Sequence, residues 1–270
     1  MNIIDIGSNS VRLFDGKVKT VITTRLAENM TGGELDHSSM QRTVDAIKSL
    51  SENAGGHCLA FATEAVRKAT NKADFIEAVR ATTGIVIDVL SGEQEAEISY
   101  MGATLGFTGS AAVIDLGGAS CEVIFGAARK IVYKASFPFG CVTMKDKFND
   151  DLDGITEYVN SLLKGLPSHS ADRYIAVGGT ATALAAMAQG LPVYDPSKVD
   201  GYSLESSVIS RLIVQTIAGK TFPTLQENRR KTIVQGATAL SAVIARLGQN
   251  SVTVSEKDNL EGYALKHNLM

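Results

Sequence analysis

A six-residue pattern occurs twice in the chain and constrains its fold more than any other feature. Residues 5–10 (DIGSNS) and residues 115–120 (DLGGAS) share the arrangement D-x-G-x-x-S. Each copy ends one short apolar stretch and precedes another. An internal repeat indicates a repeated structural unit, so the two copies predict two similar halves. Each half should open with a glycine-containing β-hairpin.

The elements expected around each copy follow the same order, with strands first and then alternating helices and strands. This pattern predicts an α/β fold of two domains, one formed by residues 1–110 with a C-terminal segment at 252–270 and the other by residues 111–251. The expected strands cover residues 3–6, 11–14, 18–24, 58–62, 85–90, 111–115, 121–125, 130–135, 174–177 and 251–255. The expected helices cover residues 39–51, 74–81, 93–105, 143–148, 154–163, 181–188, 204–218, 231–247 and 259–268.

The composition argues against a membrane protein, a nucleic-acid-binding protein and a metal site built from histidine and cysteine. No apolar run approaches the roughly 18–20 residues that span a bilayer, and the N-terminus lacks the pattern of a signal peptide, so we expect a soluble, cytoplasmic protein without a membrane partner. A net charge of −3 offers no basic footprint for nucleic acid. The three cysteines and four histidines show no metal-ligand spacing. A metal would therefore be held by carboxylates, which suits Mg²⁺.

The two hairpins have the composition of phosphate sites. Glycine lets successive backbone N–H groups turn toward an anion, and serine hydroxyls add donors. Asp5 and Asp115 would repel a phosphate, so each is a candidate Mg²⁺ anchor. A plain tight turn remains the alternative for either copy alone. The candidate phosphate-binding residues of the hairpins are Ser8, Asn9, Ser10, Gly117, Gly118 and Ser120.

Other candidates lie outside the hairpins. Gly178 and Gly179 join a strand to a helix, where free N–H groups could bind an anion or glycines could simply permit close packing. The sequence does not separate these two explanations. Arg12 and Arg67 could each contact phosphate or be solvated, because arginine forms fork-like bonds with phosphate. For the basic cluster at residues 229–231, solvated side chains are favoured.

Taken together, these segments resemble the exopolyphosphatase/guanosine pentaphosphate phosphohydrolase (Ppx/GppA) family of the actin/Hsp70/sugar-kinase superfamily. The resemblance covers nearly the whole chain, and it is carried by the combination of segments because each segment alone is weak. They are residues 4–13 (IDIGSNSVRL), 62–67 (ATEAVR), 91–96 (SGEQEA), 114–122 (IDLGGASCE), 139–142 (FGCV), 201–202 (GY), Arg229 with Gly236, and 260–262 (LEG).

The resemblance implies two ribonuclease-H-like (actin-like ATPase) domains with an interdomain cleft. It also implies Mg²⁺-dependent hydrolysis of terminal phosphates from polyphosphate or pppGpp, which would be the partners of this chain. Glu95 matches the catalytic base, and Asp115 and Glu122 match positions that hold metal and water. Asn9, Gly117, Gly118 and Ser120 match phosphate-contacting positions, and Gly140 and Cys141 match positions that line the cleft.

The local sequence around Glu95 also bears on its role. Ser91 and Gln94 form an S-x-x-Q capping box, so a helix should begin near Gly92. Glu95 then lies at the edge of an apolar stripe, where its pKa could be tuned for general base catalysis. Position alone nevertheless favours a solvated glutamate at the start of a helix. For Cys141, a small buried residue is the favoured interpretation.

Some positions depart from the family pattern. Gln94 stands where an acid is common, and Ala119 replaces a third glycine of the second hairpin. These departures keep open a non-catalytic polyphosphate or nucleotide sensor. The superfamily keeps open a second alternative, an ATP-dependent kinase, which would need an adenosine pocket beside Gly178 and Gly179. The sequence also leaves open the choice between polyphosphate and pppGpp, and whether the chain forms a homodimer.

Overall fold

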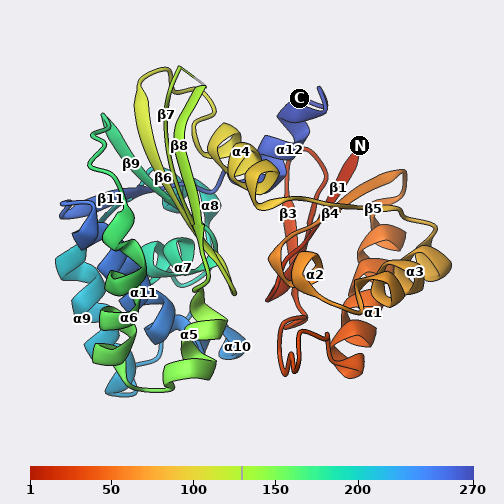
Figure 1. Ribbon diagram of the computed structural model, residues 1–270, viewed down its shortest axis with the longest axis horizontal. Coiled ribbons are helices and arrows are strands. Elements are labelled where there is room, and N and C mark those ends of the chain that lie inside the picture. Colours follow the sequence, from red (N-terminus) through yellow and green to blue (C-terminus); the bar gives the residue numbers. More distant parts are fainter. Residues whose placement is uncertain (129) are drawn as a thin grey trace. The chain divides into compact units, whose positions relative to one another are not determined.

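The computed structural model describes residues 1–128 and 130–270, with the backbone alone described at residue 228. The chain forms two compact units. Residues 1–98 and 259–270 make the first, and residues 99–258 make the second. Each unit is built on one β-sheet (Figure 1).

The sheet of the first unit begins with the strands that flank the first hairpin. β1 and β2 are antiparallel, as are β2 and β3, whereas β4 runs parallel to β1 and β5 runs parallel to β4. The strand order is β3-β2-β1-β4-β5. The strands are β1 (Asn2–Ile6), β2 (Ser10–Phe14), β3 (Lys19–Thr23), β4 (Cys58–Ala62) and β5 (Ile87–Val89).

Helices cover both faces of this sheet because its strands are apolar on both sides. Ile4 and Ile6 lie in the cluster that includes Ile47 and Phe75, whereas Ile3 faces the opposite cluster with Phe61 and Tyr263. Successive strand residues point to opposite faces, which explains this division. The helices are α1 (His37–Ala54), α2 (Glu64–Lys68), α3 (Lys72–Thr83), α12 (Asn259–Lys266) and the first part of α4 (Gly92–Ala103).

The sheet of the second unit repeats the arrangement of the first. Its order is β10-β11-β9-β6-β7-β8, with β6, β7 and β8 antiparallel in turn and β9 parallel to β6. From β8 to β11 it therefore matches the order from β3 to β5. The strands are β6 (Ser110–Leu116), β7 (Cys121–Ala127), β8 (Lys130–Phe137), β9 (Arg173–Val177), β10 (Ser203–Glu205) and β11 (Ser251–Val254).

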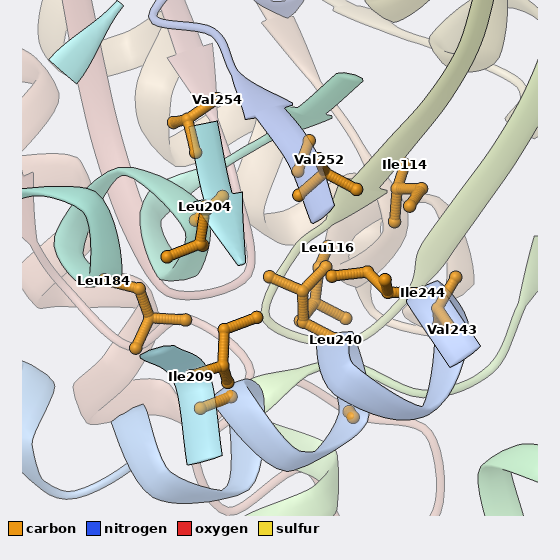
Figure 2. Packing of buried hydrophobic residues seen from close by; sticks show 14 of the residues in the cluster. Ile114, Leu116, Leu184, Leu204, Ile209, Leu240, Val243, Ile244, Val252 and Val254 are labelled. Atoms are coloured by element: carbon orange, nitrogen blue, oxygen red, sulfur yellow. The ribbon is translucent and has the colours of Figure 1, made fainter. Parts of the chain in front are cut away.

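A buried helix, α11, organises the core of the second unit. Leu240, Val243 and Ile244 of α11 lie in one cluster with Leu116 of β6 and Val252 of β11 (Figure 2). This helix packs against α5, α6, α7 and α9. The helices are α5 (Cys141–Phe148), α6 (Leu152–Leu162), η1 (Leu163–Gly165), α7 (Gly179–Ala188), α8 (Pro196–Val199), α9 (Ser206–Ile217), α10 (Glu227–Arg230) and α11 (Ile233–Arg246).

The predicted α/β class with two ribonuclease-H-like domains is confirmed. Sequence periodicity missed the short elements α2, α8, α10 and β10, which have too few residues to show a period. The units also divide differently from the predicted domains, because residues 99–110 and 252–258 lie in the second unit. The reason at the C-terminal side is that β11 pairs with β9. In the part of the chain that is described, no helix is long and apolar enough to cross a membrane.

Candidate active site

The first hairpin presents backbone N–H groups at its turn. The Gly7 N–H donates to the Ser10 carbonyl at 3.0 Å and closes the turn. The N–H groups of residues 24, 25 and 27 donate to the carbonyls of Asn9 and Ser8 at 2.9–3.1 Å. Within residues 1–128 and 130–270, the Ser8 and Asn9 N–H groups donate to no backbone carbonyl. The turn therefore has the polarity of an anion-binding nest.

An arginine neutralises the aspartate of this hairpin. Asp5 is 3% exposed, and its partner across the β1–β2 ladder is Arg12. Arg12 Nε donates to Asp5 Oδ2 at 3.0 Å, and Arg12 Nη2 contacts the same oxygen. The Arg12 guanidinium thus forms an ion pair inside its own hairpin. The alternative of a fully solvated Arg12 is therefore wrong.

The second hairpin repeats the turn with the opposite charge at the facing position. The Gly117 N–H donates to the Ser120 carbonyl at 3.0 Å, as in the first hairpin. Asp115 lies opposite Glu122 in the β6–β7 ladder, so a carboxylate occupies the place that Arg12 has in the first unit. Facing like charges destabilise a strand pair unless a cation or a proton lies between them.

Both carboxylates of this pair are buried and receive hydroxyl donors. Asp115 is 8% exposed and Glu122 is 1% exposed. Ser99 Oγ donates to Asp115 Oδ2 at 2.7 Å, and Ser136 Oγ donates to Glu122 Oε1 at 2.6 Å. The pair and its surroundings offer oxygen ligands, as a hard divalent cation requires.

Of the three expected metal ligands, Asp115 and Glu122 lie together in the second unit, whereas Asp5 lies in the first. Among residues 1–128 and 130–270 there is no group of three or more His, Cys, Asp or Glu side chains suited to a metal ion. A pair of carboxylates is nevertheless the usual protein contribution to Mg²⁺, which keeps several waters and binds substrate phosphates. The residues present therefore fit a Mg²⁺ ion that is only partly coordinated by protein.

Gly140 brings the start of α5 against the second hairpin. The N–H groups of Cys141 and Val142 donate to the carbonyls of Gly117 and Gly118 at 3.0 and 2.8 Å. A Cβ atom at position 140 would lie 2.4 Å from the carbonyl carbon of Gly118. This close backbone approach turns the hairpin carbonyls toward α5, which leaves the Gly118 N–H free of any partner in the described chain.

We expect Gly140→Ala to lower both stability and phosphate binding. The added methyl group would overlap the backbone of Gly118, and the second hairpin would have to shift to make room for it. Overpacking of this kind typically costs about 1–3 kcal/mol. Thermal unfolding should show a fall of about 2–4 °C per kcal/mol for a domain of this size. Gly165→Ala is the control, since a Cβ there meets nothing within 4 Å. Equal melting temperatures for the two variants would contradict the prediction.

Gly178 and Gly179 place the start of α7 beside the end of β6. Gly178 has φ +92°, and a Cβ there would lie 2.8 Å from the Leu116 carbonyl and 3.5 Å from Asp115 Oδ1. Close packing therefore accounts for Gly178. The N–H groups of residues 179–181 at the start of α7 have no acceptor in the described part of the chain, and anion binding there stays a prediction.

The solvated interpretation of the basic cluster at 229–231 is wrong for its first member. Arg229 is half-buried, and its Nη1 donates to the Gly179 carbonyl at 2.7 Å. Arg230 and Lys231 are exposed, as expected. Local sequence could not reveal the Arg229 contact because its partner lies 50 residues away.

The cysteines near the second hairpin are not set up as thiolates. Burial raises the pKa of Cys121 well above its ordinary value, and the charges of Glu122 and Asp115 raise it further. Burial also raises the pKa of Cys141. Both thiols therefore stay protonated at neutral pH.

Glu95 lies at the start of α4, where the predicted capping box is confirmed. The Gln94 N–H donates to Ser91 Oγ at 3.1 Å, and the Ser91 N–H donates to Gln94 Oε1 at 2.8 Å. The helix begins at Gly92. Glu95 is 5% exposed, so the solvated interpretation favoured by position alone is wrong. Gln94 has a structural role at this helix start.

Arg67 holds Glu95 through a buried ion pair. Arg67 Nη1 donates to Glu95 Oε2 at 2.7 Å and to the Leu90 carbonyl at 2.9 Å, and Arg67 Nη2 contacts Glu64. Burial disfavours the Arg67 cation, but hydrogen bonds and attraction to Glu95 and then Glu64 raise its pKa overall. The Arg67 side chain is therefore fixed within the first unit. Sequence reasoning gave Glu64 no role, although it lies one turn before Arg67.

The candidate residues thus divide between the two units. The first unit contains the hairpin residues Asp5, Ser8, Asn9, Ser10 and Arg12, and the Arg67–Glu95 pair. The second unit gathers Asp115, Gly117, Gly118, Ser120, Glu122, Gly140, Cys141, Gly178 and Gly179.

Comparison with known proteins identifies the family of the chain. Residues 9–269 match the sequence model of the Ppx/GppA phosphatase family. The chain belongs to that family. Over 99% of its length it is 28% identical to the guanosine-5'-triphosphate,3'-diphosphate pyrophosphatase of Vibrio parahaemolyticus, of which it covers 58%. It is also 28% identical to exopolyphosphatase 2 of Mycobacterium tuberculosis over 97% of its length and 96% of that protein.

A solved member of the Ppx/GppA family has the same fold. The crystal structure of the Aquifex aeolicus member superposes with a TM-score of 0.80 at 28% identity, covering 99% of this chain and 97% of that one. The chain spans about half the length of several curated relatives that it matches, namely 46%, 49% and 58% of three of them.

Proposed function

We propose that this chain is a phosphoanhydride hydrolase that releases the terminal phosphate of inorganic polyphosphate, of pppGpp, or of both. One observation carries the proposal: two buried carboxylates, Asp115 and Glu122, face each other directly beside a glycine turn whose Gly118 N–H has no backbone acceptor in the described chain. Membership of the Ppx/GppA family, with relatives named for these two substrates, supports it.

The hairpins supply the phosphate contacts in this proposal. Backbone N–H groups at Ser8, Asn9 and Gly118 would donate to phosphate oxygens, with the hydroxyls of Ser10 and Ser120 as further donors. The start of α7 at Gly179 offers a second set of N–H groups. Such preorganised donors stabilise charge that develops during phosphoryl transfer without reorganising at the moment of reaction.

Asp115 and Glu122 would hold Mg²⁺, which when bound offsets the negative charge of the phosphate oxygens. Ser99 and Ser136 orient the two carboxylates through hydroxyl hydrogen bonds of 2.7 and 2.6 Å. Asp5 was an equal candidate as a metal anchor on sequence grounds. Its ion pair with Arg12 makes it the weaker of the candidates, since the Arg12 cation already compensates its charge.

Glu95 would act as the general base that takes a proton from the attacking water. The Arg67 hydrogen bond at 2.7 Å fixes the orientation of the Glu95 carboxylate. A positioned base of this kind contributes about 10²–10⁴-fold to a rate. In-line attack needs little else from the protein beyond positioning and charge stabilisation.

Phosphate release across a panel of substrates tests the proposal. The panel is polyphosphate of several lengths, pppGpp, ATP and a simple phosphomonoester, each with and without Mg²⁺. We expect Mg²⁺-dependent release from polyphosphate or pppGpp and little from the monoester. Tight binding of these anions without release would favour a sensor instead. Phosphate transfer from ATP to an acceptor would favour a kinase.

A further inference from the structure

Arg25 lies against the first hairpin in an uncommon backbone conformation. It lies two residues after the end of β3, and its N–H donates to the Asn9 carbonyl at 2.9 Å. Its φ is +51°, a left-handed value that is rare for a residue with a Cβ atom. Such a conformation persists only where the surroundings impose it, and it recurs at functional sites. The backbone of Arg25 is therefore fixed beside the proposed phosphate turn.

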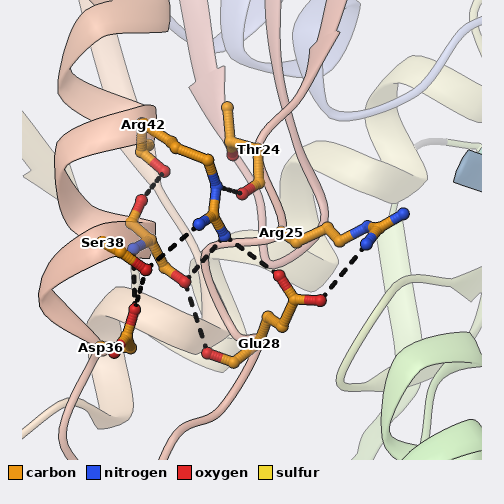
Figure 3. Close-up of polar contacts among 8 residues, drawn as sticks. Thr24, Arg25, Glu28, Asp36, Ser38 and Arg42 are labelled. Atoms are coloured by element: carbon orange, nitrogen blue, oxygen red, sulfur yellow. Dashed lines mark hydrogen bonds and ion pairs between the residues drawn. The ribbon is translucent and has the colours of Figure 1, made fainter.

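A network from α1 holds the segment that contains Arg25. Arg42 Nε donates to the Thr24 carbonyl at 3.2 Å, and Arg42 Nη2 donates to Glu28 Oε2 at 3.1 Å. Arg25 Nη1 contacts the other oxygen, Glu28 Oε1, at 3.3 Å. In Figure 3, the Arg25 guanidinium lies on the side of Glu28 opposite Arg42. Ser38 and Ser39 complete the network around Arg42.

Two cations share one carboxylate in this network. Arg25 and Arg42 both pair with Glu28, so these three side chains carry one surplus positive charge. The second carboxylate of the network, Asp36, accepts from Ser38 and Ser39. The Arg25 side chain is 26% exposed and that of Glu28 is 37% exposed. Ion pairs at that exposure contribute only about 0–1 kcal/mol, so an incoming anion could replace Glu28 at low cost.

The guanidinium of Arg25 is also less occupied than those of comparable arginines. Glu28 is its only side-chain partner within residues 1–128 and 130–270, through one contact of 3.3 Å. Arg80 makes two bonds of 2.8 Å to Glu77 at the same i,i+3 spacing. Arg12 and Arg67 are each engaged by more than one bond within the first unit. Of these four arginines, Arg25 has the largest share of its donor fork available.

We propose that Arg25 is a further substrate contact, which binds a phosphate group beyond the terminal one in a phosphoanhydride chain. The proposal rests on the hydrolase function proposed above. The turn N–H groups are assigned to the terminal phosphate, and the Arg25 backbone is bonded to the same turn while its guanidinium pairs with Glu28, so its side chain is assigned to the next phosphate along the chain. Arg42 and Glu28 act as positioning residues for the segment. A planar guanidinium suits bidentate binding of phosphate.

Direct binding tests the proposal without requiring turnover. Binding of orthophosphate, pyrophosphate, long inorganic polyphosphate and pppGpp would be measured by calorimetry in the Glu95→Gln background, with phosphate release followed in the same samples. Arg25→Met, Arg25→Lys and the matched control Arg80→Met would be compared with that parent. Circular dichroism and thermal unfolding would establish that each variant folds.

We expect Arg25→Met to weaken the binding of long polyphosphate about 10-fold, since a charged hydrogen bond of this kind is lost. The loss should be smaller for orthophosphate, and Arg25→Lys should recover part of it. The slope of log K against log salt should fall by about one, by the argument of counterion release. Comparing the loss of affinity for pppGpp with the loss for inorganic polyphosphate shows which of the two phosphate chains Arg25 binds.

Three results would overturn the role of Arg25. One is polyphosphate binding by Arg25→Met within 2-fold of the Arg80→Met control. A second is an equal loss for orthophosphate and long chains, which would place Arg25 in support of the turn only. A third is a parent protein that binds no phosphate chain. By contrast, normal binding with no phosphate release by the wild-type protein would reject the hydrolase function while leaving the Arg25 contact standing.

Discussion

Replacing Glu95 by glutamine is expected to lower kcat by about 10²–10⁴-fold while substrate binding is largely retained, because the amide cannot accept the proton of the attacking water. The carboxamide oxygen can still receive the Arg67 hydrogen bond, so the start of α4 should keep its geometry. Steady-state kinetics of phosphate release, with binding measured separately, would report kcat and affinity independently.

The matched control is Glu97→Gln, two residues further along the same helix. Glu97 is exposed and pairs with Lys266 at 2.8 Å on the surface. Its replacement should leave kcat within about 2-fold, as is usual for surface substitutions. Comparable activity in the two variants would reject Glu95 as the base. A fall caused by unfolding would be visible as a lowered melting temperature.

Asp115→Asn should remove most activity, by about 10²–10³-fold, and raise the Mg²⁺ concentration needed for half-maximal activity. The reason is that a neutral amide is a poor ligand for a hard cation beside Glu122. The Ser99 hydroxyl can still donate to the amide oxygen. Titration of activity with Mg²⁺ would separate a lost cation site from a lost catalytic group.

Asp115→Asn should lower activity without lowering the stability of the fold. In the absence of divalent cation, Asp115→Asn removes one of two facing buried charges, so the melting temperature should stay the same or rise. Asp153→Asn, at the exposed first turn of α6, is the control for loss of an acidic charge. Retained activity together with a lowered melting temperature would show that Asp115 is a structural residue.

Much of the fold could be predicted from sequence because its determinants are local. The D-x-G-x-x-S repeat, the alternation of apolar residues and the S-x-x-Q capping box each act over a few residues. The element order and the two hairpins follow from them. The domain limits did not follow, because the pairing of β11 with β9 joins residues that are far apart along the chain.

The candidate site was predicted less completely, and for the same reason. The burial of Glu95 depends on Arg67, 28 residues earlier, and Arg229 reaches a carbonyl 50 residues earlier. The hydroxyl donors Ser99 and Ser136 gave no signal in a motif. One clue was available: aligning the two repeats sets Arg12 against Glu122, and that difference shows that the two hairpins are not electrostatic equivalents.

This asymmetry has a thermodynamic consequence. The first sheet carries its own counter-charge in Arg12, so its folding should depend little on divalent ions. The second sheet sets Asp115 opposite Glu122, so a divalent cation bound at this pair would add to the stability of the second unit. Binding to the folded state alone adds RT ln(1 + [Mg²⁺]/Kd) to stability. The unfolding temperature of the second unit should then rise with the Mg²⁺ concentration, whereas that of the first unit should stay the same.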